Sequence, residues 1–280
     1  MNELRYVYAV TRPFDGALPD GNLPDDLRGL DGEPPRLLHH AGLVAVVSPV
    51  PAEDFDEAPL KAHLEDLDWL TGTARTHEAV IGVLTTLTCP VPLRLATVCR
   101  DDSGVRRLIE ADHDRFVRTL ERLDGRIEWG VKVYAHTPRE DTQGAAQGAA
   151  PEADEPPPAT GRDYLRRRLG QRRKRESAWQ RADSMARTLH AGLSERAEAG
   201  VLHRPQDARL SDEPGVNVLN AAYLVRREES AAFIAEIDRL GPKEPDGGVR
   251  VELTGPWAPY SFAGLAGLAG LAGHAEEGSR

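Results

Sequence analysis

The second half of the chain switches repeatedly between two hydrophobic periods, and this order restricts its fold more than any other feature. Apolar residues at every second position predict strands, whereas apolar residues three or four positions apart predict helices. The order is strand, helix, strand, strand, helix, strand, with strands expected at 127–135, 202–210, 216–225 and 249–254 and helices at 162–199 and 228–240. This is the order of the split βαβ, or ferredoxin-like, arrangement. We therefore predict a ferredoxin-like domain here.

The first half predicts a second mixed domain. Strands are expected at 4–10, at 93–98 and in a hairpin formed by 36–40 and 43–48. Three-to-four spacing of apolar residues from Pro59 to Leu84 predicts two helices, or one bent helix, with a possible break at Gly72. Asp101, Asp102 and Ser103 form an N-cap cluster for one further helix that ends near Leu123.

Together these patterns predict an α+β protein with two domains. The N-terminal α+β domain is expected at 1–124 and the C-terminal ferredoxin-like domain at 125–262. Residues 138–160 are rich in Pro, Gly, Ala and acidic residues, so we expect a disordered insertion inside the second domain. Residues 263–280 repeat Gly-Leu-Ala and predict a flexible tail.

Composition excludes several classes of protein. The net charge of −10 argues against a general nucleic-acid binder. No apolar run approaches the ~20 residues that a membrane-spanning helix needs, and the N-terminus has no signal-peptide pattern. The two cysteines, Cys89 and Cys99, suit a reducing compartment and match no zinc spacing, so we expect a cytoplasmic protein.

The motif search predicts no catalytic or metal centre. His39 and His40 point to opposite faces of a strand, and His77 lies on the buried stripe of a helix, where a packed histidine is favoured over a ligand. Phosphate-binding GxxxxGK[ST] and hydrolase GxSxG motifs are absent. Cys89 has no activating neighbour, which favours a structural thiol. We therefore predict no enzyme, no cofactor and no metal.

A basic run at 162–175 leaves two interpretations open. It indicates either the solvated face of a long helix or a binding site for an acidic protein, for RNA or for phosphate. The expected buried stripe of the same helix consists of apolar residues at helical spacing, namely Leu165, Leu169, Trp179, Ala182, Ala186, Leu189 and Leu193.

The last apolar segment, 249–262, also has two interpretations. Its alternating start predicts a strand that ends at Gly255-Pro256, because proline supplies no ladder donor. Trp257, Tyr260 and Phe262 then form an aromatic cluster that either closes the domain core or contacts another chain. Arg94, expected on the strand at 93–98, lies opposite two leucines.

Six segments, in order and from both halves, resemble the gas vesicle protein F/L family. They are YVYAV at 6–10, ARTHEAVI at 74–81, PVPLRLATVCRD at 90–101, EWGVKVYA at 128–135, NAAYLV at 220–225 and LTGPWAPYSF at 253–262. Leu95 and Ala96 stand where the family often has an aromatic residue followed by glycine.

The resemblance implies an accessory protein of gas vesicle assembly without catalytic activity. Such a protein binds the hydrophobic shell protein, works beside other gas vesicle accessory proteins, and is cytoplasmic and associated with the vesicles. We expect its partner-binding surface around Arg94, Trp257, Tyr260 and Phe262. The alternatives are a small-molecule- or haem-binding ferredoxin-like protein, possibly an enzyme, and an RNA-binding module on the basic run.

Overall fold

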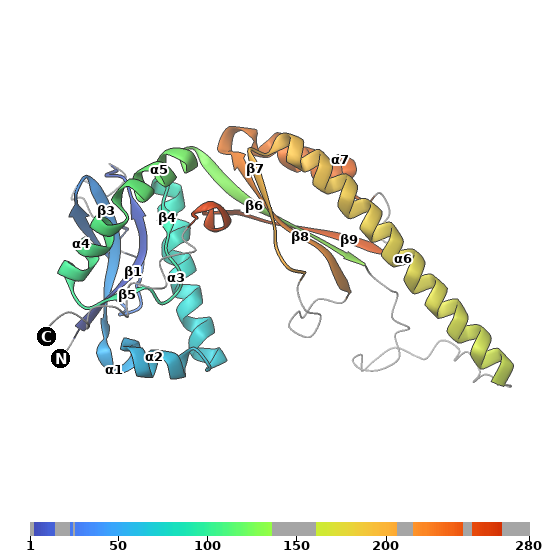
Figure 1. Ribbon diagram of the computed structural model, residues 1–280, viewed down its shortest axis with the longest axis horizontal. Coiled ribbons are helices and arrows are strands. Elements are labelled where there is room, and N and C mark those ends of the chain that lie inside the picture. Colours follow the sequence, from blue (N-terminus) through green and yellow to red (C-terminus); the bar gives the residue numbers. More distant parts are fainter. Residues whose placement is uncertain are drawn as a thin grey trace, which may run out of the picture. The chain divides into compact units, whose positions relative to one another are not determined.

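The computed structural model describes residues 3–14, 23–24, 26–135, 161–205, 215–242 and 248–264. The chain forms two compact units (Figure 1). Unit 1 comprises Met1–Glu128 and Pro256–Arg280, and unit 2 comprises Trp129–Gly255. The predicted α+β class is confirmed, with two sheets accompanied by helices.

Unit 1 is built on a five-stranded sheet in which each strand pairs antiparallel with its neighbours. The strand order is β2-β3-β1-β4, and β5 also pairs with β1. The bounds are β1 Glu3–Thr11, β2 Arg36–His40, β3 Leu43–Pro51, β4 Val91–Pro92 and β5 Val98–Cys99. The predicted hairpin is confirmed by the register of β2 on β3, and Ala41 and Gly42 between them both adopt positive φ.

Helices cover both faces of this sheet. Leu4, Tyr6 and Tyr8 alternate along β1 and form a core with Val80 and Ile81 of α3. The next side chain, Arg5, faces the other way and bonds to Asp102 of α4, so α3 and α4 lie on opposite faces (Figure 1). The helix bounds are α1 Ala52–Phe55, α2 Glu57–His63, α3 Leu67–Leu87, α4 Asp102–Ala111 and α5 His113–Leu123.

Unit 2 has the predicted element order β6, α6, β7, β8, α7, β9, with a short 3-10 turn, η1, before α7. Its four strands are arranged β7-β8-β6-β9. The second half of α6 packs on α7 and β8. The bounds are β6 Arg126–Ala135, α6 Gly161–Arg196, β7 Ala199–Leu202, β8 Val216–Arg226, η1 Arg227–Glu229, α7 Ser230–Leu240 and β9 Val249–Trp257.

Two predictions in unit 1 are wrong. In the strand expected at 93–98, residues 93–97 form a turn between β4 and β5 and only Val98 lies in a strand, because Ala96 adopts φ 62° and its N–H donates to the hydroxyl of Tyr6. The helix expected after Asp101 is two helices, α4 and α5, separated by Asp112, whose backbone is not helical. The Asp101 cap itself is correct, since its side chain accepts from Gly104 N–H.

The helical region after Pro59 divides elsewhere than expected. Gly72 lies inside α3, and the break between α2 and α3 falls at 64–66, where Asp66 caps α3 by accepting from Asp68 and Trp69. Asp66 provides the side-chain acceptor that a helix start needs, whereas a single glycine only weakens a helix that tertiary contacts hold.

Two expectations in the second half also change. The strand expected at 202–210 is β7 at Ala199–Leu202, and 206–210 lie outside the described residues. β9 continues through Gly255-Pro256 to Trp257. Because β9 is an edge strand, the missing N–H of Pro256 need not interrupt a ladder.

The two units differ from the predicted domains at their boundaries. The first change of unit falls after Glu128, four residues beyond the expected position, and residues 256–262 belong to unit 1 instead of the C-terminal domain. The predicted insertion, 138–160, and residues 265–280 of the predicted tail lie outside the described residues.

Candidate functional site

The C-terminal segment of unit 1 is held by a buried carboxylate. Glu128 is 8% exposed and accepts two hydrogen bonds from Ser261, from the backbone N–H at 2.8 Å and from the hydroxyl at 2.7 Å. The guanidinium of Arg122 donates to the carbonyl oxygen of Phe262. The short 3-10 turn Tyr260–Phe262, η2, is therefore fixed at its backbone and at one side chain.

Beside this segment lies a cluster of tyrosines around His77. The hydroxyl of Tyr6 lies 2.9 Å from Nδ1 of His77 and accepts from the N–H of Ala96 at 3.1 Å. The ring of Tyr260 lies 6.3 Å from the His77 ring, centre to centre. Burial lowers the pKa of His77 to about 4, so the imidazole is neutral at physiological pH. The prediction that His77 packs in the core is confirmed.

Two carboxyl groups face the same region. Burial raises the pKa of Glu78 and of Glu128, and the hydrogen bonds from Ser261 counteract this rise at Glu128. The pKa of Tyr260 is raised, first by burial and then by the negative charge of Glu78. These groups hold the C-terminal segment of unit 1 in place. Nε2 of His77 and the hydroxyl of Tyr260 are both buried, and neither has a hydrogen bond of ordinary geometry among the described residues.

The four residues predicted to bind a partner separate into two pairs. Phe262 is 4% exposed, and Tyr260 packs against the core of unit 1 with its hydroxyl buried. Trp257 is 42% exposed, and Arg94 is exposed in the turn between β4 and β5. No hydrogen bond, ion pair or ring contact within the described ranges joins Arg94 to the three aromatic side chains. For Tyr260 and Phe262, the core interpretation therefore fits the structure.

The histidines and cysteines that the structure describes do not converge on one site. His40 lies 2.6 Å from the carboxylate of Glu110, and His63 stacks on Trp69. Cys89 donates to the carbonyl of Leu123, and burial raises the pKa of Cys99 to about 11. In the part of the chain that the structure describes, no three His, Cys, Asp or Glu side chains are grouped to hold a metal ion.

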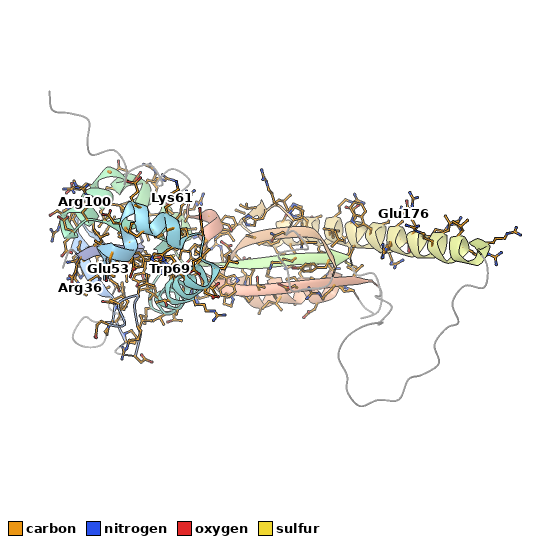
Figure 2. The ribbon with its side chains drawn as sticks, turned by 90° about the horizontal axis from the view of Figure 1, so that it is seen from below. Arg36, Glu53, Lys61, Trp69, Arg100 and Glu176 are labelled. Atoms are coloured by element: carbon orange, nitrogen blue, oxygen red, sulfur yellow. The ribbon has the colours of Figure 1, made fainter. Side chains whose placement is uncertain are left out.

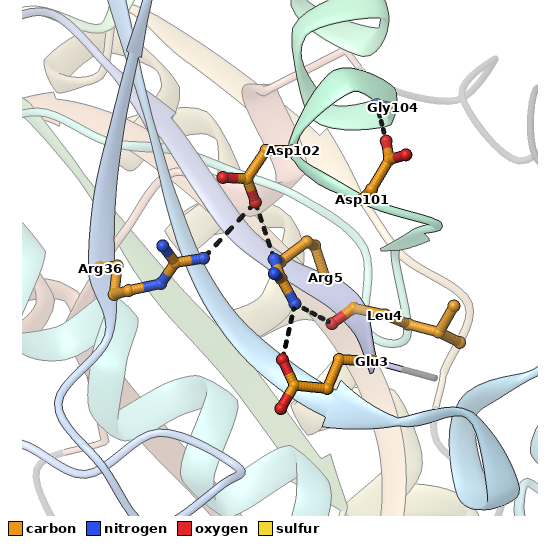
Figure 3. A network of polar contacts seen from close by, with 7 residues as sticks. All are labelled: Glu3, Leu4, Arg5, Arg36, Asp101, Asp102 and Gly104. Atoms are coloured by element: carbon orange, nitrogen blue, oxygen red, sulfur yellow. Dashed lines mark hydrogen bonds and ion pairs between the residues drawn. The ribbon is translucent and has the colours of Figure 1, made fainter. Parts of the chain in front are cut away.

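An ion-pair network that the sequence did not indicate joins three elements of unit 1 (Figure 3). Asp102, at the start of α4, accepts from Arg5 of β1 at 2.7 Å and from Arg36 of β2 at 3.4 Å, and Arg5 also approaches Glu3 at 3.5 Å. Arg5, and less strongly Arg36, lowers the pKa of Asp102. Asp102 lies 97 positions from Arg5 and 66 positions from Arg36 in the sequence. No local sequence pattern indicates pairing over such separations, so the network is visible only in the folded structure.

Most of the described side chains in the first half of α6 are exposed. Leu165 and Leu169 are 59% and 57% exposed, and Trp179 is 51% exposed, although all three were expected in the buried stripe. Among the side chains of α6 that the structure describes, Ala178 is the first buried one, and further buried residues follow in the second half of the helix. Figure 2 shows side chains such as Glu176 projecting from this part of α6. The stripe prediction is therefore correct for Ala182, Ala186, Leu189 and Leu193 alone.

The surface of unit 1 carries a groove of about 550 Å³. Residues 49–52, from the end of β3 and the start of α1, give it an apolar wall. Its four charged lining residues are all acidic, namely Glu3, Asp31, Glu33 and Glu53. No helix within the described ranges is both long enough and apolar enough to cross a membrane.

Comparison with known proteins identifies the family to which this chain belongs. Residues 4–264 match the family model described as gas vesicle synthesis protein GvpL/GvpF, and the chain belongs to that family. Membership gives it a role in gas vesicle formation, and the family is described by gas vesicle synthesis and not by an enzymatic reaction.

Individual members of this family are similar to the chain to different degrees. The chain is 64% identical to gas vesicle protein L of Streptomyces sp. strain CB03234 over 94% of each chain. It is 26% identical to gas vesicle protein F of the same strain, over 92% of this chain and 98% of that one. The crystal structure of GvpF from Anabaena sp. PCC7120 superimposes with a TM-score of 0.62 at 18% identity, covering 93% of this chain and 96% of that one. The fold is thus that of GvpF.

Proposed function

We propose that this chain is an accessory protein of gas vesicle assembly that binds the hydrophobic shell protein and assists its incorporation into the vesicle wall. The observation that carries the proposal is the family match over residues 4–264. In this proposal the chain acts in the cytoplasm at growing vesicles, together with the shell protein and other accessory proteins.

The physical need for such a protein follows from the wall itself. A subunit that lines a gas-filled space has an apolar surface, and exposed apolar patches and strand edges aggregate before assembly. A carrier must cover that surface and then release it, so its contact is small and reversible.

Two features of this chain support such a contact. Trp257 exposes 42% of its surface at the end of β9, and tryptophan is the side chain most often found to dominate binding energy. The other is the edge strand β9 of unit 2, to which an extended segment of a partner can add by strand pairing. Arg94, exposed on the β4–β5 turn, is the second residue assigned to partner binding.

Co-purification tests the proposal. The shell protein, expressed beside the tagged chain, is expected to be retained by the wild type. Trp257→Ala and Arg94→Ala are compared with Phe262→Ala, which alters a buried aromatic residue close to Trp257 in the sequence. For Trp257→Ala we expect about 2 kcal/mol of lost binding, roughly a thirtyfold weaker complex, at an unchanged melting temperature.

Failure of the wild-type chain to retain the shell protein, with or without the other accessory proteins, would contradict the proposal. If the shell protein binds but Trp257→Ala and Arg94→Ala leave the affinity unchanged, the function stands and the assigned surface is wrong.

A further inference from the structure

The first half of α6 presents a face of exposed side chains that the described residues of unit 2 do not cover. Leu165, Arg168, Leu169, Arg172 and Arg175 line a shallow hollow of about 470 Å³, and spacings of three and four residues place them along the same side of the helix. We call this set the leucine–arginine face. Two leucines that are each more than half exposed, side by side on a helix, form an unpartnered apolar strip.

The charges beside these leucines restrict what can cover them. The three arginines of the face form no ion pair within the described part of the chain. An apolar partner with positive charges would be repelled, and a wholly apolar one would leave three guanidinium groups without water or counter-charge. The face therefore requires a partner surface that is apolar and acidic together.

This chain carries such a surface on unit 1. The groove described above combines the apolar wall of residues 49–52 with four acidic side chains, and we call it the acidic groove. Glu3 is partly neutralised by Arg5 at 3.5 Å, so Asp31, Glu33 and Glu53 supply most of its negative charge. Its volume of about 550 Å³ has room for more than one leucine side chain.

We propose that the leucine–arginine face of one copy docks into the acidic groove of a second copy. Leu165 and Leu169 enter against the apolar wall, while Arg168, Arg172 and Arg175 pair with the acidic side chains around it. The two surfaces are different parts of the chain, so the contact is head-to-tail and adds further copies as a ring or an open row. This inference does not depend on shell-protein binding.

The size of the contact sets its strength. One half-helix in one groove buries little area, which is typical of weak, concentration-dependent association. Because charge pairs contribute much of the contact, association is expected to weaken as salt is added. The net charge of −10 on each copy opposes association at long range, so the local positive charge of α6 has to overcome it.

Sedimentation velocity of the full chain tests this proposal over a range of concentrations at low and high salt. We expect a monomer that forms larger species as concentration rises at low salt. Leu165→Gln with Leu169→Gln, and separately Arg168→Glu with Arg172→Glu and Arg175→Glu, are each expected to weaken association by tenfold or more. Glu33→Arg with Glu53→Arg is expected to do the same from the other surface.

A charge exchange gives the sharpest readout. A mixture of the arginine-reversed chain with the glutamate-reversed chain is expected to associate, although each alone does not. The wild-type face of the glutamate-reversed chain fits the wild-type groove of the arginine-reversed chain, and opposite charges are restored between the two reversed surfaces. The matched control reverses three other exposed arginines, Arg75, Arg118 and Arg204, and therefore changes the net charge by the same amount. Melting temperatures show that each variant is folded.

Three results would overturn the proposal: a wild-type chain that stays monomeric at every concentration, association that the control reversal weakens as much as the α6 reversal, and a charge-exchange mixture that remains monomeric. Shell-protein capture by the same variants is measured in parallel, so failure of self-association is distinguishable from failure of the proposed function.

Discussion

The C-terminal segment of unit 1 and the first half of α6 in unit 2 carry similar apolar side chains, yet they are buried to opposite extents. Phe262 is 4% exposed, whereas Leu169, on a helix expected to be buried along its length, is 57% exposed. The segment is fixed by Glu128 and covered by the core of unit 1, while the described elements of unit 2 leave Leu165 and Leu169 in the first half of α6 exposed. Burial here depends on the partner element more than on the hydrophobicity of the segment.

The largest expected effect distinguishes Phe262 from Trp257 within the C-terminal segment of unit 1. Phe262→Ala removes a buried aromatic side chain and is expected to cost about 3–5 kcal/mol in the free energy of unfolding. Trp257→Ala, which truncates a side chain that is 42% exposed, is expected to cost much less. Denaturant unfolding of both variants measures this, and equal losses would show that Trp257 also belongs to the core.

A second pair of variants compares the two halves of α6. Leu189→Ala, at a position that is 0% exposed, is expected to cost about 2–5 kcal/mol. Leu169→Ala is expected to stay within about 0.5 kcal/mol of the wild type, because exposed positions contribute little to stability. Thermal unfolding distinguishes them. A large loss from Leu169→Ala would mean that the first half of α6 is covered within the chain.

Sequence patterns predicted the elements well where local signals and tertiary contacts agree. The hairpin of β2 and β3 and the order of elements in unit 2 were predicted because alternation and three-to-four spacing reflect the faces that are buried there. The turn at 93–97 was not predicted, because it depends on a hydrogen bond from the N–H of Ala96 to the hydroxyl of Tyr6, which lies 90 positions away in the sequence.

The candidate site was predicted less completely, for the same reason. The motif containing Trp257, Tyr260 and Phe262 identified the segment, but their exposure depends on Glu128 and on α3, which no local pattern connects to it. The ion-pair network around Asp102 and the acidic groove are assembled from distant segments and gave no sequence signal.

Acid stability tests the buried histidine of unit 1. The pKa of His77 is lowered from 6.5 to about 4 in the folded chain, so below pH 6.5 the unfolded chain takes up a proton that the folded chain does not. Stability from this group is therefore present above pH 6.5 and lost as the pH falls toward 4, by up to about 3 kcal/mol.

Glu78 and Glu128 act in the opposite direction. Their raised pKa values mean that the folded chain binds protons more readily, so their contribution increases as the pH falls. The difference between wild type and His77→Gln, measured as the free energy of unfolding across this range, isolates the histidine. A difference that does not change with pH would contradict a buried neutral His77.

The smallest expected effect concerns the turn that carries Arg94. Ala96 adopts φ 62°, a left-handed conformation that glycine adopts without steric cost. Ala96→Gly is expected to raise the free energy of unfolding by about 0.5–1 kcal/mol, since the relief of strain exceeds the extra freedom of glycine in the unfolded chain. Thermal unfolding would measure the gain, and a loss of stability would show that the alanine methyl group contributes packing that outweighs the strain.

The gas vesicle content of cells that lack this chain tests the central claim most directly. If the chain acts by binding and delivering the shell protein, its deletion abolishes or sharply reduces floating cells and vesicles seen by electron microscopy, and the wild-type gene restores both. Cells that retain normal buoyancy and normal vesicles after the deletion would contradict the account.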